Sequence, residues 1–239
     1  MNISVVIPAY NEENRIKKSI IKIIAYLENN FGKYEILVVD DGSTDSTHRT
    51  ISELNNSNIS ILRNKKNKGK GHSIKKGVLS AEYELILVTD ADLSTPIEEL
   101  GKFIKYIKQG YDVVFGSRNL KGSKIKESQP FYRQLMGKTF PLLVNIITSL
   151  KFKDTQCGFK LFKNQAAKEI FNRQTIDGFA FDAEILFIAN NLKYRIKEAP
   201  VVWSNSKESK VSPIKDSIKM FVDILKIRLN DLSGKYKIR

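Results

Sequence analysis

The chain has 239 residues, of which 41% are apolar, and it carries a formal net charge of +14. This length and apolar content allow one large buried core, which excludes a disordered protein. Cys157 is the single cysteine, so an internal disulfide is excluded and a reducing compartment fits. No apolar run approaches the roughly 20 residues that cross a bilayer, so we expect a cytoplasmic protein without a membrane-spanning helix.

The positive charge is concentrated towards the C-terminus. Residues 193–239 hold 12 Lys/Arg against 5 Asp/Glu, which is half of the net excess. A basic region can bind nucleic acid, an anionic membrane or a phosphorylated substrate, and lysines can also simply be solvated. The sequence contains no recognised nucleic-acid-binding motif. We therefore expect no nucleic-acid partner and keep a basic nucleic-acid-binding protein as the non-enzyme alternative.

The first half of the chain alternates predicted strands and helices. Apolar strands are expected at residues 3–7, 34–39, 59–62, 84–89 and 112–116. The helix that begins near Glu12 places Ile16, Ile20 and Ile23 at helical spacing. Repeated β-α-β units with near-continuous apolar strands predict an α/β fold, with a mostly parallel central sheet and helices on both faces.

The second half follows a less regular pattern, with a polar loop expected first. The predicted elements are a loop at 121–129, an apolar helix at 131–150 interrupted by Pro141, a loop and strand at 154–162, a helix at 179–192, a strand at 195–203 and a helix from 213 to about 232. The sequence has no internal repeat or low-complexity tract, so we expect no repeat architecture.

Polar and charged residues follow several of the predicted strands. They are Tyr10 and Glu12 after the first strand, Asp40 and Asp41 after the second, Asp90 and Asp92 after the fourth, and Arg118 after the fifth. In parallel sheets, ligands bind at the carboxyl ends of the strands. The convergence of these residues on one edge predicts a ligand site there, although aspartates after the second strand could also be turn and cap residues.

The segment Asp90-Ala91-Asp92 indicates the chemistry of this site. Two carboxylates directly after a buried strand suit Mg²⁺ or Mn²⁺ that carries a diphosphate. The turn after the first strand lacks the Gly-x-Gly-x-x-Gly of a dinucleotide site, and residues 69–73 lack the spacing of a P-loop. These two nucleotide sites are therefore excluded, and the ligand expected from the residues alone is a metal-bound diphosphate.

Three spaced motifs resemble the inverting family-2 glycosyltransferases of GT-A fold. They are Val-Ile-Pro-Ala-Tyr-Asn-Glu-Glu at residues 6–13, Val-Val-Asp-Asp-Gly-Ser-Thr-Asp at 38–45, and Asp90-Ala91-Asp92. Later segments, at 154–162, 179–184, 203–213 and 223–228, resemble the dolichyl-phosphate β-glucosyltransferase branch of the polyprenyl-phosphate glycosyltransferases. Some dolichyl-phosphate mannosyltransferases carry an arginine after the late strand, which is absent here.

The resemblance implies a role for each matching residue. Near the nucleotide sugar it places Pro8, Ala9, Tyr10, Glu12, Asp40, Asp41, Lys70, Asp90, Ala91 and Asp92, with Asp40 accepting a hydrogen bond from uracil. Asp92 would bind Mg²⁺ or Mn²⁺, with Asp90 and Ser94 as further ligands. Arg118, Arg133 and Lys210 would hold the acceptor phosphate, and Asp182 would face the acceptor. For Asp154, a loop cap and an active-site role are equally open.

The implied reaction is the inverting transfer of glucose from UDP-glucose to a polyprenyl phosphate, either dolichyl or undecaprenyl phosphate. The acceptor phosphate is already anionic near neutral pH, so a strong general base is less necessary than charge stabilisation and alignment. The enzyme alternatives are a related transferase that uses GDP-mannose or UDP-N-acetylglucosamine, or one that acts on a cell-surface glycan.

The final predicted helix indicates contact with a membrane surface. Its apolar stripe comprises Ile214, Ile218, Phe221, Val222, Leu225, Leu229 and Leu232, and Lys215, Lys219 and Lys226 line one border. Such a helix suits an anionic lipid interface, and the alternative is that the stripe packs on the domain. We predict a catalytic domain at 1–211, a basic amphipathic segment at 212–239, and peripheral attachment to the cytoplasmic face of an anionic membrane.

Overall fold

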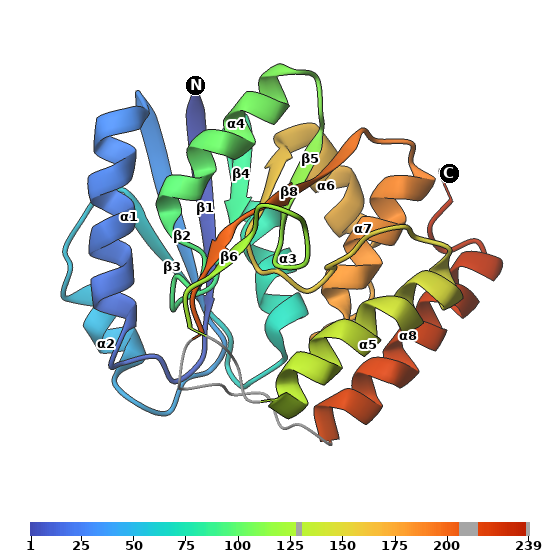
Figure 1. Ribbon diagram of the computed structural model, residues 1–239. Coiled ribbons are helices and arrows are strands. Elements are labelled where there is room, and N and C mark those ends of the chain that lie inside the picture. The colour runs from blue at the N-terminus through green and yellow to red at the C-terminus, as the bar shows by residue number, and fades with distance from the viewer. Residues whose placement is uncertain (128–130, 206–214, 238–239) are drawn as a thin grey trace.

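The computed structural model describes residues 1–127, 131–205 and 215–237, with the backbone alone at 131–138 and 215–216. Its centre is a seven-stranded sheet in the order β3-β2-β1-β4-β7-β5-β8 (Figure 1). The strands are β1 (Asn2–Ala9), β2 (Lys33–Asp40), β3 (Ile59–Arg63), β4 (Leu85–Val88), β5 (Val113–Ser117), β7 (Lys160–Lys163) and β8 (Ile196–Pro200). Of these seven, β7 alone runs antiparallel to its neighbours, which confirms the predicted mostly parallel sheet.

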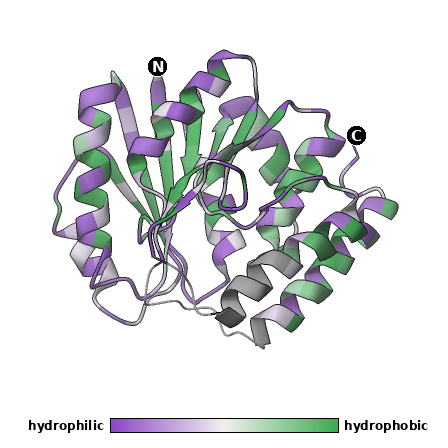
Figure 2. Ribbon diagram, in the orientation of Figure 1, coloured by the Kyte–Doolittle hydropathy of each residue, from purple (hydrophilic) through white to green (hydrophobic). Residues whose placement is uncertain are grey.

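Helices cover both faces of the sheet, as predicted. One face packs against α1 (Ile16–Asn30), α2 (Thr47–Ser52), the 3-10 helix η1 (Ile97–Glu99) and α4 (Leu100–Lys108). The other packs against α3 (Lys70–Ser80), α6 (Asn164–Arg173) and α7 (Phe181–Asn191). Along β1, Ile3 and Val5 enter the first core and Val6 the second, because successive side chains of a strand point to opposite faces. The green strands between helices with purple outer faces in Figure 2 show the same division.

Two further helices lie side by side at one end of the molecule (Figure 1). They are α5 (Phe131–Thr148) and α8 (Lys215–Leu232), and α8 also packs against α7. The core-facing side of α8 carries Ile224 and Ile227, both fully buried. The helix α5 runs through Pro141 without a break, so the interruption that we predicted there is wrong.

The apolar stripe predicted for the last helix faces outward. Its described members are Ile218, Phe221, Val222, Leu225, Leu229 and Leu232, which are between 42% and 70% exposed. Leu142, Leu143 and Ile146 of α5 are exposed as well. For these residues, the alternative that the stripe packs on the domain is wrong, and Ile214 lies outside the described residues. Within the described part of the chain, no helix is long and apolar enough to cross a membrane.

The segment predicted as one strand at 195–203 is divided between two sheets. β8 ends at Pro200, and Val202–Trp203 form β9, which pairs in parallel with β6 (Lys124–Ile125) inside the predicted polar loop. Pro200 has no N–H to continue a ladder. Beyond it, the carbonyls of Val201 and Trp203 accept hydrogen bonds from Lys124 N and Lys126 N. This turn brings Trp203 to the edge where the parallel strands end.

Candidate functional site

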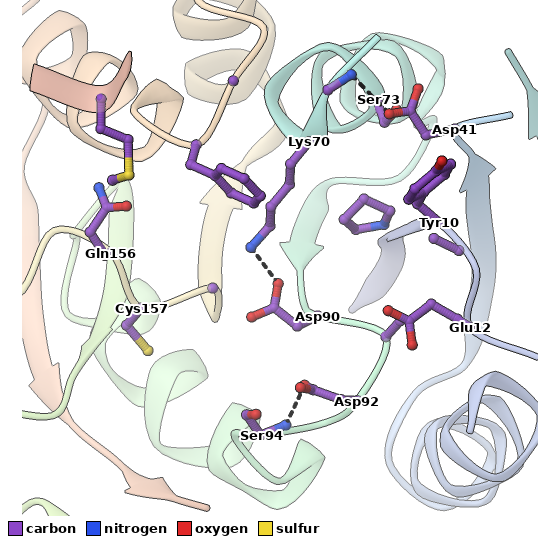
Figure 3. Close-up of a pocket in the computed structure, with 18 of the residues that line it drawn as sticks. Tyr10, Glu12, Asp41, Lys70, Ser73, Asp90, Asp92, Ser94, Gln156 and Cys157 are labelled. Atoms are coloured by element: carbon purple, nitrogen blue, oxygen red, sulfur yellow. Dashed lines mark hydrogen bonds and ion pairs between the residues drawn. The ribbon is translucent and has the colours of Figure 1, made fainter. Parts of the chain in front are cut away.

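A cavity of about 450 Å³ opens at the carboxyl ends of β1 and β4. One wall comes from the loops after these two strands and from the start of α3, and the other comes from the segment before β7, from β9 and from α8. Figure 3 shows Lys70 and Asp90 between two groups, with Tyr10, Glu12 and Asp41 on one side and Gln156 and Cys157 on the other. Of the strand-end residues predicted to converge on one edge, all but Asp40 line this cavity.

Asp92 lies in a tight turn at the cavity wall. Its Oδ1 accepts a hydrogen bond from Ser94 N at 2.9 Å, and Leu93 between them has a positive φ of 49°. Arg15 ion-pairs with Glu12 and places its Nη1 3.8 Å from Asp92 Oδ2. Glu12 N in turn donates to Thr47 Oγ1. The carboxylate of Asp92 is therefore fixed by backbone and guanidinium contacts while it faces the cavity (Figure 3).

Asp90 forms an ion pair with Lys70 across the floor of the cavity, at 2.6 Å between Oδ1 and Nζ. Burial opposes the charge on both groups, but their mutual attraction outweighs it, so the pKa of Lys70 is raised and that of Asp90 is lowered. Gly158 packs directly on Asp90, because a Cβ at this position would lie 2.0 Å from Oδ2. Only a glycine leaves room for this carboxylate.

A second ion pair, between Lys160 on β7 and Asp182 on α7, lies close to the first. Lys160 is fully buried and Asp182 is 3% exposed, and Lys160 Nζ also donates to the carbonyl of Cys157. Burial raises the pKa of Asp182, while the nearby lysines Lys160 and Lys70 lower it without reversing the shift. Neither Lys160 nor Asp182 is among the residues that line the cavity, so this ion pair lies behind the lining.

Arg118 is held by the third ion pair of the site. Its Nε and Nη2 bind the two oxygens of Asp154 at 2.7 and 2.9 Å, and its backbone N also donates to Asp154. The guanidinium lies over the ring of Trp203, 5.5 Å from its centroid. Burial alone would raise the pKa of Asp154, but the ion pair and hydrogen bonds to Arg118 hold it below its ordinary value. Asp154 is therefore a buried partner of Arg118 rather than a simple loop cap.

The two aspartates after β2 have different surroundings. Asp41 lines the cavity wall and accepts hydrogen bonds from Asn64 Nδ2, Lys68 N and Gly69 N, which hold the loop that leads into α3. Gly69 has a positive φ of 109°, which favours glycine. Asp40 is fully buried, accepts a hydrogen bond from Ser43 N and lies 3.1 Å from Arg63 Nε. Its carboxylate does not line the cavity.

The carboxylates of Asp90 and Asp92 are the oxygen donors that fit a divalent metal ion here. The described residues hold no cluster of three or more His, Cys, Asp or Glu side chains suited to a metal. Mg²⁺ and Mn²⁺ bound to a diphosphate need only one or two protein carboxylates, because phosphate oxygens and water complete the shell. The donor set of this cavity therefore fits a metal that arrives with a diphosphate.

The structure brings most of the predicted residues together. Pro8, Ala9, Tyr10, Glu12, Asp41, Lys70, Asp90, Ala91, Asp92, Ser94 and Arg118 all line the cavity. Asp40 and Asp182 do not. Arg133 lies on α5 with its side chain outside the described part, and Lys210 lies outside the described residues. Sequence reasoning missed Arg15, Gly158, Lys160 and Lys219, of which Arg15, three residues after Glu12, carried a local signal.

Comparison with known proteins gives the family. Residues 4–171 match the Glycosyl transferase family 2. A dolichyl-phosphate beta-glucosyltransferase of Trichomonas vaginalis is 39% identical over 240 residues, covering 94% of this chain and 72% of that protein. The human dolichyl-phosphate beta-glucosyltransferase is 33% identical over 251 residues, covering 99% of this chain and 78% of the human protein.

Solved structures show the same fold at low sequence identity. Mannosyl-3-phosphoglycerate synthase from Rubrobacter xylanophilus is 16% identical with a TM-score of 0.70, covering 100% of this chain and 76% of that one. Glucosyl-3-phosphoglycerate synthase from Mycobacterium tuberculosis, crystallised with Mn²⁺, UDP and glucosyl-3-phosphoglycerate, is 17% identical with a TM-score of 0.69, covering 100% and 81%. The chain is a glycosyltransferase of GT-A fold and belongs to glycosyl transferase family 2.

Proposed function

We propose that this enzyme transfers glucose from UDP-glucose to a polyprenyl phosphate with inversion, giving a β-linked lipid-phosphate sugar. The observation that carries the proposal is the similarity, over 94–99% of this chain and at 33–39% identity, to proteins named dolichyl-phosphate beta-glucosyltransferase. The cavity supports it, because its walls carry both carboxylates, which suit a metal ion bound to a diphosphate donor, and cations, which suit a phosphate acceptor.

The donor side of the cavity would hold UDP-glucose. Asp92, with Asp90 beside it, would hold Mg²⁺ or Mn²⁺, and Pro8 to Glu12 would border the nucleoside. A divalent metal ion, when bound there, neutralises charge on the departing diphosphate. Lys70 supplies a further cation on the same wall, and Asp90 keeps it protonated, since the pKa of Lys70 is raised above its ordinary value.

The acceptor side would align the incoming phosphate. One of its oxygens attacks C1 of glucose, the bond from C1 to the diphosphate oxygen breaks, and UDP leaves with the electron pair. The acceptor oxygen is already anionic, so no base on the protein has to remove a proton from it. Arg118 is held rigidly by Asp154, which fixes a guanidinium on this side at little entropic cost during the reaction.

The acceptor is a lipid, and the exposed apolar residues of α5 and α8 offer a surface for membrane contact. Large side chains there would enter the interface of an anionic bilayer, with nearby lysines at the headgroups. We propose that residues 1–211 form the catalytic domain, that 212–239 form the segment that attaches it, and that attachment is peripheral, on the cytoplasmic face.

A binding experiment tests the donor site and separates the proposal from the nucleic-acid alternative. UDP with Mn²⁺ should raise the melting temperature of the protein, because a ligand that binds the folded state stabilises it. Asp92→Ala should lose the metal-dependent part of this protection. Protection by DNA or RNA with a steep salt dependence, and none by UDP, would favour the nucleic-acid-binding alternative instead.

A further inference from the structure

The cavity has four described cations on its walls, and three of them have carboxylate partners. Arg15 pairs with Glu12, Lys70 with Asp90, and Arg118 with Asp154. These pairs fix the geometry of the site, but each partner carboxylate offsets the charge that a new anion would meet. The fourth cation, Lys219 on α8, has no carboxylate within 4.0 Å among the described residues.

Lys219 lies at the point where α8 meets the cavity. Its Nζ is 3.8 Å from the position that a Cβ on Gly178 would occupy, so the ammonium group lies against the turn that leads into α7. Asp223, one helical turn further along, lines the same edge of the cavity: its Oδ1 is paired with Lys226 at 2.9 Å, and its Oδ2 lies 3.5 Å from the same Cβ position. The ammonium group of Lys219 is therefore exposed at the cavity edge with its donors available.

The exposed apolar stripe of α8 borders Lys219. Ile218, the preceding residue, is 63% exposed, and Val222, three residues further along on the same side of the helix, is 44% exposed. A molecule that lays a hydrocarbon chain along this face of α8 and turns its polar end into the cavity meets Lys219 first. The ligand that fits both features is a phosphomonoester on a long apolar chain, because an ammonium ion binds phosphate oxygens as a compact point charge.

We infer that Lys219 binds the phosphate of the lipid acceptor at the entrance from the α5 and α8 surface. The inference rests on the proposed function and extends it, because it assigns the acceptor phosphate to a residue outside the family motifs. Arg118 then orients the acceptor with a charge that Asp154 already offsets, whereas Lys219, which has no ion-pair partner among the described residues, supplies the positive charge that attracts it.

The test compares Lys219→Gln with the control Arg228→Gln. Arg228 is an exposed cation on the same helix, two to three turns away, and it pairs with Asp231. Initial rates are measured with saturating UDP-glucose and Mn²⁺ and with increasing amounts of a short-chain polyprenyl phosphate in detergent, so that membrane attraction plays no part. Lys219→Gln should raise the acceptor KM by roughly 10- to 100-fold, the loss expected for one charge-assisted hydrogen bond. Arg228→Gln should leave it within about twofold, and Lys219→Arg should recover most of the loss.

UDP affinity in the presence of Mn²⁺, measured by calorimetry on the same variants, should be unchanged. An acceptor KM for Lys219→Gln close to that of the wild type would overturn the inference. Equal weakening of UDP and acceptor binding would overturn it too, by assigning Lys219 to the donor. If the wild-type protein itself transfers no sugar to any polyprenyl phosphate, the proposed function fails and the inference falls with it.

Discussion

Replacing Gly158 by alanine should displace the carboxylate of Asp90 and damage the donor site. An alanine Cβ would lie 2.0 Å from Asp90 Oδ2, 2.5 Å from its Cγ and 2.6 Å from Oδ1, whereas ordinary contact begins near 3.4 Å. Asp90 would have to retreat by about 1.4 Å. An aspartate side chain is short, and Lys70 holds it at 2.6 Å, so this movement strains the ion pair. Overpacking of this kind costs about 1–3 kcal/mol.

The assay for Gly158→Ala has two parts. Its melting temperature should fall by about 2–4 °C for each kcal/mol lost, and the further rise that UDP and Mn²⁺ give the wild type should be largely absent. The matched control is Gly32→Ala, where the nearest atom to an added Cβ is Asn2 Oδ1 at 3.9 Å. If Gly158→Ala kept wild-type UDP protection and wild-type activity, the inferred dependence of the donor site on Asp90 would be refuted.

Three further predictions follow from other contacts. Asp154→Asn leaves Arg118 without its carboxylate and should cost about 3–5 kcal/mol of unfolding free energy at pH 7. Burial opposes the charge on Asp154, but Arg118 outweighs it and holds the pKa of this carboxyl below the ordinary 3.8. The stability that the carboxylate contributes is therefore present above pH 3.8 and lost as pH falls through the folded pKa. The unfolding free energies of the wild type and Asp154→Asn, measured by urea titration, should converge in acid. The double substitution Leu229→Ser and Leu232→Ser should weaken sedimentation with anionic vesicles by roughly tenfold, with transfer to a detergent-solubilised acceptor unchanged; unchanged sedimentation would remove α8 from the membrane contact. Asp92→Ala should abolish sugar transfer and metal-dependent UDP binding together, and retained transfer would exclude Asp92 as the metal ligand.

The sequence predicted the sheet, and the meeting of strand-end residues at one edge of it, because both depend on local patterns. Continuous apolar runs mark the parallel strands, and the loops that follow them must meet at one edge. The ion pairs were beyond such reasoning. Lys70 and Asp90 are 20 residues apart, and Lys160 on β7 and Asp182 on α7 are 22 residues apart. The pattern within one segment carries no information on which distant side chain will pair with a charged residue in that segment.

The roles of Asp40 and Asp182 illustrate the same limit. The family resemblance placed Asp40 near the uracil and Asp182 near the acceptor. In the structure both carboxylates are buried beside basic groups, and neither lines the cavity. Conversely, the stripe on the last helix was predicted correctly as a group, but its orientation was open. Only the packing of Ile224 and Ile227 against the domain fixes which face of α8 points outward.

The most direct test of the account is to identify the product that the purified protein makes. The protein is incubated with Mn²⁺, a short polyprenyl phosphate and, separately, UDP-glucose, UDP-N-acetylglucosamine, UDP-galactose or GDP-mannose, and lipid-linked sugar is measured by mass spectrometry. The account predicts a hexosyl lipid phosphate from UDP-glucose, with a β linkage by NMR. Product from a different donor alone, or UDP binding without any lipid product, would contradict it.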